Sequence, residues 1–357
     1  RCHCAITIMP RKLTHVLASL LFSALAALAQ AAPADKPTFA DDQAAIDFAR
    51  DLEQRHGFKA DELISQFAQT RPNATVLKLI KPPVSPLQRS WERYRPRFLN
   101  DRRIDGGVQF WQENGAQLAK AQAIYGVPAE IIVAIIGVET EYGRNTGGFR
   151  VFEALATLAF NYPPRAEFFR TELEQFLLLA RENNLDPLAV KGSFAGAIGI
   201  PQFMPGSQRR YAVDFDGDQR VDLGNSVDDA IGSVARFLEQ HGWQAGQPVA
   251  VRAITSGTPD NTLIQAGIRP TLKVGDLAEK GIRANTDPEA TAALIDLVSP
   301  GQETEYWLGF DNFYVITRYN RSSFYAMSVF QLAEAIRNRM CANQQTTAEN
   351  REKYCRA

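Results

Sequence analysis

A lone carboxyl group at the end of an apolar segment is the first feature of this sequence that could do chemistry. Residues 131–136 are all Ile, Val or Ala, and Glu139 follows within the stretch Gly-Val-Glu-Thr-Glu-Tyr-Gly over 137–143. A helix over 128–140 would be apolar on every side and therefore buried. Apolar surroundings and the negative end of the helix dipole both raise the pKa of a carboxyl group. Glu139 is therefore a candidate general acid for glycosidic cleavage, and the alternative is a glutamate that reaches solvent from the helix end.

A stretch of small and apolar residues over 192–205 could hold a sugar. Its sequence is GSFAGAIGIPQFMP. Small residues let backbone amide and carbonyl groups approach a ligand closely. Ser193 and Gln202 add side-chain hydrogen-bonding groups and Phe203 adds an apolar ring, which suits the hydroxyls and C–H faces of a saccharide. Tyr and Asn are also dense over 314–327, where they could line a groove. The alternative is that both stretches pack tightly in the interior.

An aspartate-rich stretch further along the chain is typical of calcium binding. Its acidic residues fall at positions 1, 3, 5 and 9 of a calcium loop: Asp214, Asp216, Asp218 and Asp222. Two positions depart from the usual pattern, because Gln219 stands in place of Gly and Asn225 stands in place of a bidentate Glu. Asp228, three residues later, is the predicted replacement for that carboxylate. The sequence thus predicts a structural calcium site, and the alternative is an Asp-rich turn without metal.

Histidine and cysteine are scarce, which disfavours several other chemistries. The chain has four of each, and two of each lie within the first fifteen residues. His56 and His241 each precede a glycine at an apparent helix end, which is a capping pattern. We therefore expect both to be structural. This disfavours a zinc site built from several histidines and a catalytic triad that depends on histidine.

The N-terminal residues are typical of a secretory signal peptide. Met9 is followed by basic residues and by an apolar run over 16–29, and residues 29–31 form a small-x-small cleavage site. We expect residues 1–31 to be removed, with residues 1–8 as an upstream extension. The run is too short to span a bilayer as a helix, and no cysteine follows it to carry a lipid anchor. The alternative is a buried N-terminal helix.

The rest of the chain would be exported and slightly acidic. Without residues 1–31 it holds 36 basic and 40 acidic residues, which argues against a dedicated nucleic-acid binder. Export lets thiols oxidise, so Cys341 and Cys355 are candidates for a disulfide, with two free thiols as the alternative. Six arginines between residues 89 and 103 form either a solvated face or a contact with an anionic polymer.

Hydrophobic periodicity predicts a mainly helical chain with one small β-rich unit. We expect helices over 41–56, 60–70, 105–125, 128–140, 149–160, 165–183, 227–241 and 323–340. Between 249 and 308, short runs that favour strands are separated by Gly, Pro, Asn and Asp. The expected fold class is therefore α+β, mainly α.

Six segments together resemble the B-type lytic murein transglycosylases, from about residue 41 to residue 332. They are GVETEYG, NYPPRAEFF, KGSFAGAIGIPQFMPGS, YAVDFDGD, SVDDAIGSVARFL and NFYVITRYNRSSFYAM. This resemblance implies a helical domain, a lysozyme-like catalytic core with the calcium loop, a small inserted β domain, a return to the core and a tail. The corresponding ranges are 38–125, 126–247, 248–308, 309–342 and 343–357.

The resemblance also implies a reaction and the residues that perform it. The family cleaves the β-1,4 bond between N-acetylmuramic acid and N-acetylglucosamine in peptidoglycan, and leaves a 1,6-anhydromuramic acid end. Glu139 matches the residue that acts first as acid and then as base, while the N-acetyl group of the substrate replaces a second carboxylate. The matching substrate positions are Ser193, Gln202, Tyr319, Asn320, Tyr325 and Arg165. Phe203 in the small-residue stretch is a further candidate. The matching calcium ligands are Asp214, Asp216, Asp218, the backbone carbonyl of Arg220, and Asp228.

The resemblance further implies where the protein works and what it meets. We expect a soluble periplasmic enzyme without a membrane span, bound to peptidoglycan glycan strands, with enzymes of cell-wall synthesis as candidate partners. No organic cofactor and no nucleic acid are expected. Ile200 and Pro201 replace the Tyr and Gly that often precede the matching glutamine in the family, which could reshape a subsite.

Two competing functions remain open at this level. A muramidase would hydrolyse the same bond, and it would need a second carboxylate or a held water. Glu141 and Asp214 are the local candidates, although Glu141 would lie roughly 200° around the helix from Glu139. A peptidoglycan-binding scaffold would bind glycan without cutting it, and the intact Glu139 argues against that reading.

Overall fold

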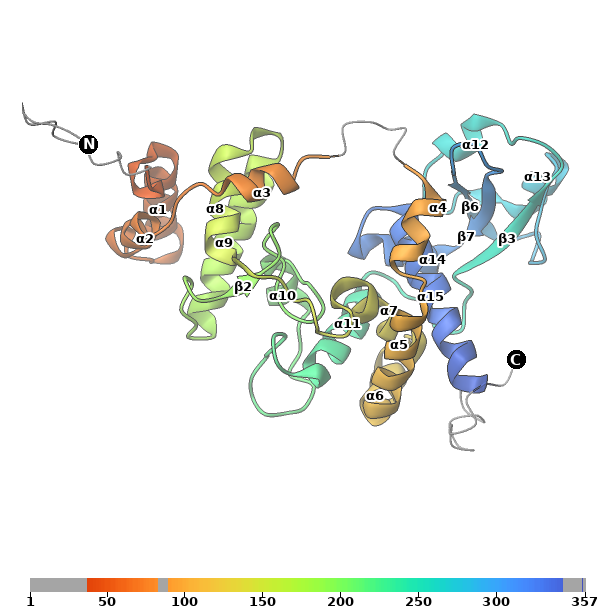
Figure 1. The fold of residues 1–357 in the computed structure, drawn as a ribbon, viewed down its shortest axis with the longest axis horizontal. Coiled ribbons are helices and arrows are strands. Elements are labelled where there is room, and N and C mark those ends of the chain that lie inside the picture. Colours follow the sequence, from red (N-terminus) through yellow and green to blue (C-terminus); the bar gives the residue numbers. More distant parts are fainter. Residues whose placement is uncertain (1–36, 83–88, 343–354, 356–357) are drawn as a thin grey trace, which may run out of the picture. The chain divides into compact units, whose positions relative to one another are not determined.

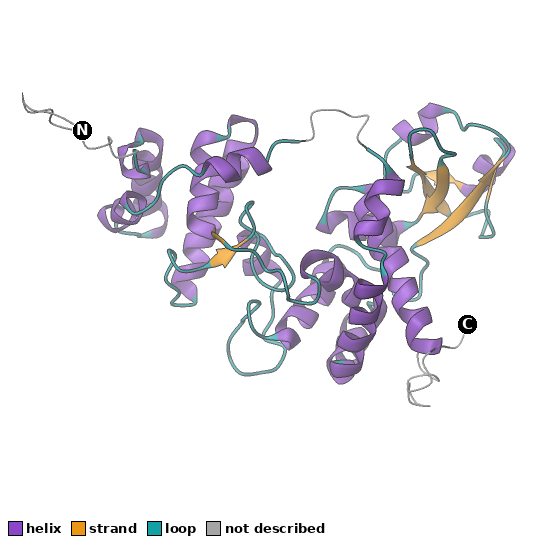
Figure 2. Cartoon of the chain, in the orientation of Figure 1, coloured by secondary structure: helices purple, strands orange, loops and turns teal. Residues whose placement is uncertain are grey.

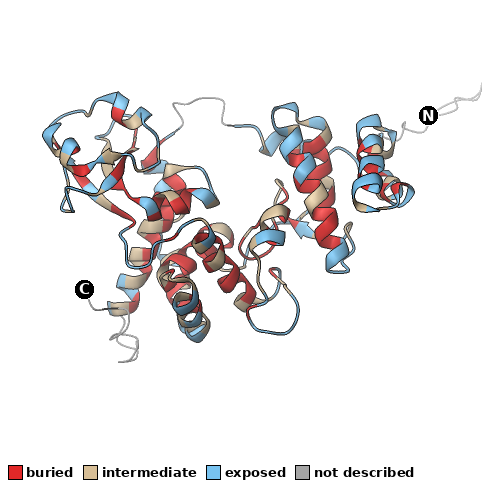
Figure 3. Cartoon of the chain, turned by 180° about the vertical axis from the view of Figure 1, so that it is seen from behind, coloured by how far each residue is buried: buried red, intermediate tan, exposed pale blue. Residues whose placement is uncertain are grey.

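The computed structural model describes residues 37–82, 89–342 and 355. The expected signal peptide lies outside the described residues, as does most of the expected tail. The described chain is mainly helical with small antiparallel sheets, which confirms the predicted fold class (Figures 1 and 2). Buried residues occur in the helices and in the sheet (red in Figure 3), and the hydrophobic ones form three clusters.

The first cluster is an aromatic core that joins the N-terminal helices to a later helical pair. Its helices are η1 (Phe39–Asp41), α1 (Gln43–His56), α2 (Ala60–Ala68), α3 (Ala74–Leu79), α8 (Val151–Asn161) and α9 (Ala166–Glu182), and the short helix η4 (Pro163–Arg165) joins the last two. The rings of Phe67 and Phe152 lie 5.1 Å apart between centroids, and Phe160 contacts Phe39 at 5.9 Å. Residues distant in sequence are thus held by one set of buried rings.

The second cluster surrounds the helix that ends in Glu139. It contains residues of α4 (Trp91–Tyr94), α5 (Asp101–Glu113), α6 (Gly115–Tyr125), α7 (Ala129–Thr140), α11 (Val227–Gln240), α14 (Asp311–Tyr319) and α15 (Ser323–Ala342). Helix α7 packs against α5, α6, α11 and α15, so Ile131 to Val138 are all buried. This confirms that the apolar segment is enclosed on every side.

No single helix in the described ranges is both long and apolar enough to cross a membrane. Helices α6 and α7 meet the length and composition criteria only as a pair, and they are bent by 113° relative to each other.

The packing divides the chain differently from the predicted helical domain over 38–125. Helices α1 to α3 belong to the aromatic core, whereas α4 to α6 belong to the cluster around α7. Periodicity reveals that a helix has an apolar face but does not identify the partner that covers it. The single helix predicted over 105–125 is also two helices. They meet at Asn114, whose side-chain amide donates to the carbonyl of Phe110 over 2.8 Å in an Asn-Gly turn.

The third cluster belongs to a five-stranded antiparallel sheet within the predicted β unit. Its strands are β3 (Ala250–Thr255), β4 (Leu272–Lys273), β5 (Ile282–Arg283), β6 (Thr291–Leu297) and β7 (Glu305–Gly309), in the order β4-β6-β7-β3-β5. The short helices α12 (Asn261–Gln265) and α13 (Val274–Glu279) supply Leu263 and Leu277 to this core. The chain leaves the sheet from β7 directly into α14, which returns to the cluster around α7.

A two-stranded ribbon and a disulfide complete the described fold. A two-stranded ribbon pairs β1 (Phe149–Arg150) with β2 (Lys191–Gly192), just before the small-residue loop, and α10 (Pro205–Tyr211) begins just after it. At the other end of the chain, Cys341 in α15 is joined to Cys355 by a disulfide, the predicted pairing.

The turn after α7 folds back so that its tyrosine ring fills a slot lined by three glycines. Glu141 and Tyr142 have φ values of 52° and 63°, so the helix ends in a left-handed turn. The Tyr142 ring lies against Gly106, Gly107 and Gly137, and its hydroxyl donates to the carbonyl of Arg103 over 2.6 Å. This packing fixes the direction in which the chain leaves Glu139.

We predict that Gly137→Ala destabilises the protein by about 1–3 kcal/mol, because a Cβ atom at Gly137 would lie 2.6 Å from the Tyr142 hydroxyl oxygen. Urea unfolding measures the effect. The matched control is Gly115→Ala at the start of α6, where a Cβ atom would meet no heavy atom within 4 Å. Equal stability of the two variants would contradict the close packing of Tyr142 against Gly137.

Candidate active site and metal loop

Glu139 occupies the penultimate position of α7, where a buried helix reaches the protein surface. Only part of the residue is exposed, and its carboxyl group lies in apolar surroundings. Burial raises the pKa of Glu139 to about 7, and the hydrogen bond from Tyr325 opposes that rise. A carboxyl group with this pKa is protonated in a substantial fraction of molecules at neutral pH, as a general acid requires.

Tyrosines from two C-terminal helices hold and enclose this carboxyl group. The Tyr325 hydroxyl donates to Glu139 Oε1 over 2.6 Å, and the Tyr325 ring stacks on Tyr319 at 6.5 Å between centroids. Tyr319 also contacts the Phe203 ring at 5.7 Å and donates its hydroxyl to the carbonyl of Pro201 over 2.5 Å. The structure thus brings four predicted site residues into one connected group: Glu139, Tyr325, Tyr319 and Phe203.

Tyr94 is a member of this site that sequence analysis missed. Burial raises its pKa, and the nearby charge of Glu139 raises it further. Tyr94 packs on Phe324, the neighbour of Tyr325, at 5.5 Å between ring centroids. Its only signal in the sequence is an aromatic residue among arginines, a pattern that does not separate a site residue from a core residue.

Gln202 and Ser193 shape the small-residue loop. Gln202 has a φ of 52°, and its side-chain amide donates to the carbonyls of Thr146 at 3.0 Å and Gly199 at 2.9 Å. The Ser193 hydroxyl accepts the backbone N–H of Ala197 over 3.0 Å. Both side chains therefore hold the backbone of the loop in place. Because the Gln202 amide nitrogen is used in this way, its side-chain carbonyl oxygen is the atom that can bind another partner.

Arg165 and Asn320 lie in other surroundings. The Arg165 guanidinium covers the rings of Phe168 and Phe169 at 4.4 and 5.0 Å, beside the aromatic core. Asn320 is exposed in the short link between α14 and α15. Within the described part of the chain, neither side chain forms a hydrogen bond, ion pair or ring contact with the group around Glu139.

Glu141 lies two residues from Glu139 in an opposite electrostatic environment. Its carboxylate forms ion pairs with Arg102 at 2.5 Å, Arg144 at 3.7 Å and Arg103 at 4.0 Å. Arg103 also donates to the carbonyl of Gly137 over 3.0 Å, so the same cation fixes the end of α7. Several of the predicted basic residues therefore brace the site, and Glu141 is committed to them rather than directed toward Glu139.

The two histidines have structural partners, as predicted. His56 contacts the Glu174 carboxylate at 2.8 Å beside Gly57, which caps α1 with a φ of 66°. His241 ends α11 and contacts the carbonyl of Phe237 at 2.6 Å through Nδ1, and burial lowers its pKa. Neither histidine neighbours Ser193 or Glu139.

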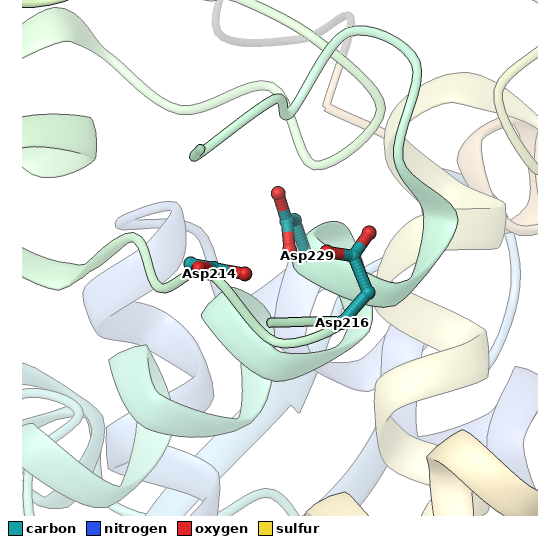
Figure 4. Close-up of side chains that lie close together, drawn as sticks. All are labelled: Asp214, Asp216 and Asp229. Carbon is teal, nitrogen blue, oxygen red and sulfur yellow. The ribbon is translucent and has the colours of Figure 1, made fainter. Parts of the chain in front are cut away.

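The aspartate-rich loop gathers three carboxylates at one point. Oxygen atoms of Asp214, Asp216 and Asp229 lie within 4.8 Å of one another (Figure 4). Asp229 is 1% exposed and accepts the backbone N–H groups of Phe215 and Asp222 at 2.7 and 2.8 Å. Burial raises its pKa. A buried carboxylate beside two others is costly without a cation, so this oxygen-rich donor set fits a hard divalent ion such as calcium.

Asp229, which was not among the predicted ligands, joins this cluster, and Asp228 stays a predicted ligand. Both residues lie in the first turn of α11, where neighbouring side chains point about 100° apart. Asp218 lies in the same loop and accepts the backbone N–H of Arg220 over 2.8 Å.

A cavity of about 730 Å³ lies between this loop and the end of α9. Its lining includes Asn183, Lys191, Asp222 and Asn225, and it shares Gly199 with the loop that Gln202 pins. Glu139 is not among the residues that line it, so this cavity does not mark the reacting group.

Comparison with known proteins places this geometry in a family. The family model described as "Transglycosylase SLT domain" matches residues 40–334. The membrane-bound lytic murein transglycosylase B of Escherichia coli is 43% identical over 313 residues, which cover 84% of each chain.

Two solved structures share the fold. The E. coli lytic transglycosylase Slt35 in complex with calcium is 42% identical, with a TM-score of 0.76 over 84% of this chain and 95% of that one. SltB3 from Pseudomonas aeruginosa in complex with NAG-NAM-pentapeptide is 30% identical, with a TM-score of 0.71 over 82% of this chain and 78% of that one. The chain therefore belongs to the lytic murein transglycosylase B family and is a lytic transglycosylase of peptidoglycan.

Proposed function

We propose that this enzyme cleaves the β-1,4 bond between N-acetylmuramic acid and N-acetylglucosamine through Glu139, and that it forms a 1,6-anhydromuramic acid end. The observation that carries the proposal is the buried Glu139 carboxyl group, whose pKa is about 7 and which accepts a hydrogen bond from one tyrosine hydroxyl. Glu139 first gives its proton to the glycosidic oxygen of the leaving N-acetylglucosamine. Its carboxylate then takes the proton of the muramyl 6-hydroxyl as that oxygen bonds to C1. The proton count closes without water.

The placement of the other acids favours this route over hydrolysis. The Glu141 carboxylate is paired with arginines, and Asp214 accepts backbone N–H groups within its own loop. Neither of them contributes to the pKa shift of Glu139, which has burial and the Tyr325 hydrogen bond as its causes, whereas an ordinary glycosidase places a second carboxylate opposite the first. The N-acetyl group of the substrate is the proposed partner instead.

The surroundings of Glu139 suit a glycan strand. Tyr319 is half-buried and packs on the buried rings of Phe203 and Tyr325, and Gln202 offers a side-chain carbonyl oxygen beside Phe203. Ser193, Asn320 and Arg165 remain proposed contacts for more distant parts of the substrate. The proposed setting is the periplasm, after removal of the signal peptide, with cell-wall synthesis enzymes as candidate partners.

We also propose that Asp214, Asp216 and Asp229 bind calcium, with Asp218 and the carbonyl of Arg220 as further ligands. The donor set consists of oxygen atoms, which calcium prefers. When bound, the ion would stabilise the loop that packs beside the small-residue loop, because the N–H of Ile200 donates to the carbonyl of Leu223 over 2.7 Å.

Glu139→Gln is expected to lower kcat on purified peptidoglycan by about 10²–10⁴-fold, because the amide can neither give nor take the proton. The matched control is Glu130→Gln. Glu130 is a largely buried carboxyl group with a raised pKa on the same helix, but it lies in the first turn and pairs with Arg337.

Mass spectrometry of the products tests the reaction class. Anhydromuramyl ends agree with the proposal, reducing muramyl ends indicate hydrolysis, and binding without soluble product indicates a scaffold.

The dependence of kcat/KM on pH should show an alkaline limb near pH 7, because the acid form of Glu139 begins the reaction and burial raises its pKa to about 7. The Tyr325 hydroxyl stabilises the carboxylate and so lowers that pKa. Tyr325→Phe is therefore expected to move the limb to higher pH. Tyr319→Phe should leave the limb in place, since that hydroxyl donates to Pro201. A limb that moves down in Tyr325→Phe would refute this assignment.

Calcium is expected to raise the thermal unfolding temperature. At a calcium concentration of about 100 times its Kd, the free energy of unfolding should rise by about 2.7 kcal/mol. Asp229→Asn should abolish the difference between calcium and EDTA, whereas the neighbouring Asp228→Asn should retain it. Differential scanning calorimetry provides the measurement. Loss of the calcium effect in Asp228→Asn alone would restore the ligand set predicted from sequence.

A further inference from the structure

The residue next to Glu139 connects the catalytic helix to the loop proposed to hold the sugar. Thr140 is 1% exposed and is the last residue of α7. Its hydroxyl donates to the carbonyl of Ile200 over 2.7 Å and accepts the N–H of Gly143 over 2.9 Å. One hydroxyl therefore serves both the loop over 199–203 and the turn that follows α7.

The two segments that meet at Thr140 also meet at Gln202. The backbone carbonyl of Thr140 accepts the N–H of Asn145 over 2.9 Å, which brings Thr146 alongside the loop. The side-chain amide of Gln202 then donates to the carbonyl of Thr146 over 3.0 Å. A closed set of hydrogen bonds thus runs from Thr140 through the turn to Gln202 and back through Ile200.

The same loop is tied to the tyrosines that face Glu139. The carbonyl of Pro201, next to Ile200, accepts the Tyr319 hydroxyl, and Tyr319 stacks on the Tyr325 ring. A shift of the backbone at Ile200 would therefore move Gln202, Phe203 and the Tyr319 contact together. The Thr140 hydroxyl ties the backbone of this loop directly to the helix that carries Glu139.

We propose that Thr140 is a positioning residue for the transglycosylase reaction, whose hydroxyl sets the distance between the Glu139 carboxyl group and the glycan-binding loop over 199–203. This inference rests on the proposed role of Glu139. It requires a hydroxyl at this position, because one atom both donates and accepts. Serine can replace threonine in this role, whereas valine, which has nearly the same shape, cannot.

The test compares Thr140→Val with Thr140→Ser by two readouts. Isothermal titration calorimetry measures the binding of a GlcNAc-MurNAc-pentapeptide fragment, which lacks the scissile linkage. The initial rate of soluble product release from peptidoglycan measures turnover. We expect Thr140→Val to weaken fragment binding and to lower kcat/KM by about ten-fold or more, because the buried Ile200 carbonyl and the half-buried Gly143 N–H lose their partner. Thr140→Ser should restore both to within about three-fold of the wild-type values.

The matched control is Thr157→Val in α8. Thr157 is also a fully buried helical threonine, and its hydroxyl both donates to the carbonyl of Glu153 at 2.7 Å and accepts the N–H of Asn73 at 3.1 Å. It belongs to the aromatic core. Thr157→Val should lower the unfolding temperature while leaving fragment binding and turnover unchanged, which separates lost stability from lost positioning.

The proposal is overturned if Thr140→Val binds the fragment and releases product as the wild type does, while its unfolding temperature falls as in Thr157→Val. Should Thr140→Val fail to fold, Thr140→Ala provides the same comparison with a smaller side chain. An active Glu139→Gln would refute the proposed catalytic role, and the fragment-binding data would still decide the role of Thr140.

Discussion

The burial of one carboxyl group governs the rest of this structure. Helix α7 is enclosed by four other helices, and Glu139 lies at the end of this helix, at the edge of the interior. Removal of water disfavours its charge, and one hydroxyl, that of Tyr325, partly offsets that cost. The balance between these two effects holds the pKa of Glu139 near neutrality, where one group can both give and take a proton.

Two glutamates that are two residues apart lie in different electrostatic surroundings. The left-handed turn at Glu141 and Tyr142 directs the second carboxylate toward Arg102, Arg103 and Arg144. The turn itself is held because Tyr142 fills a slot beside Gly106, Gly107 and Gly137. Packing at glycines therefore leaves Glu139 as the single uncommitted acid at the end of α7.

Sequence alone predicts what is local and misses what depends on partners. The apolar segment before Glu139 identifies the buried helix, and the aspartate spacing identifies the acidic loop, because both patterns are continuous in the chain. The partition of α1 to α6 between two cores depends on which faces meet, which periodicity does not encode. The spacing of the loop does not identify Asp229 as a member of the acidic cluster, because Asp229 lies in a helix, where side-chain direction changes by about 100° per residue. Tyr94 and Thr140 look like ordinary core residues until their neighbours are known.

The most direct test of this account is the pKa of the Glu139 carboxyl group itself. A ¹³C NMR titration of the glutamate carboxyl carbons, with Glu139→Gln to assign the resonance, measures that pKa without substrate. We predict a midpoint near pH 7, as burial requires. A midpoint near the ordinary glutamate pKa of about 4.3 would show that the group is solvated, and it would contradict the central claim that burial prepares Glu139 to act as both acid and base.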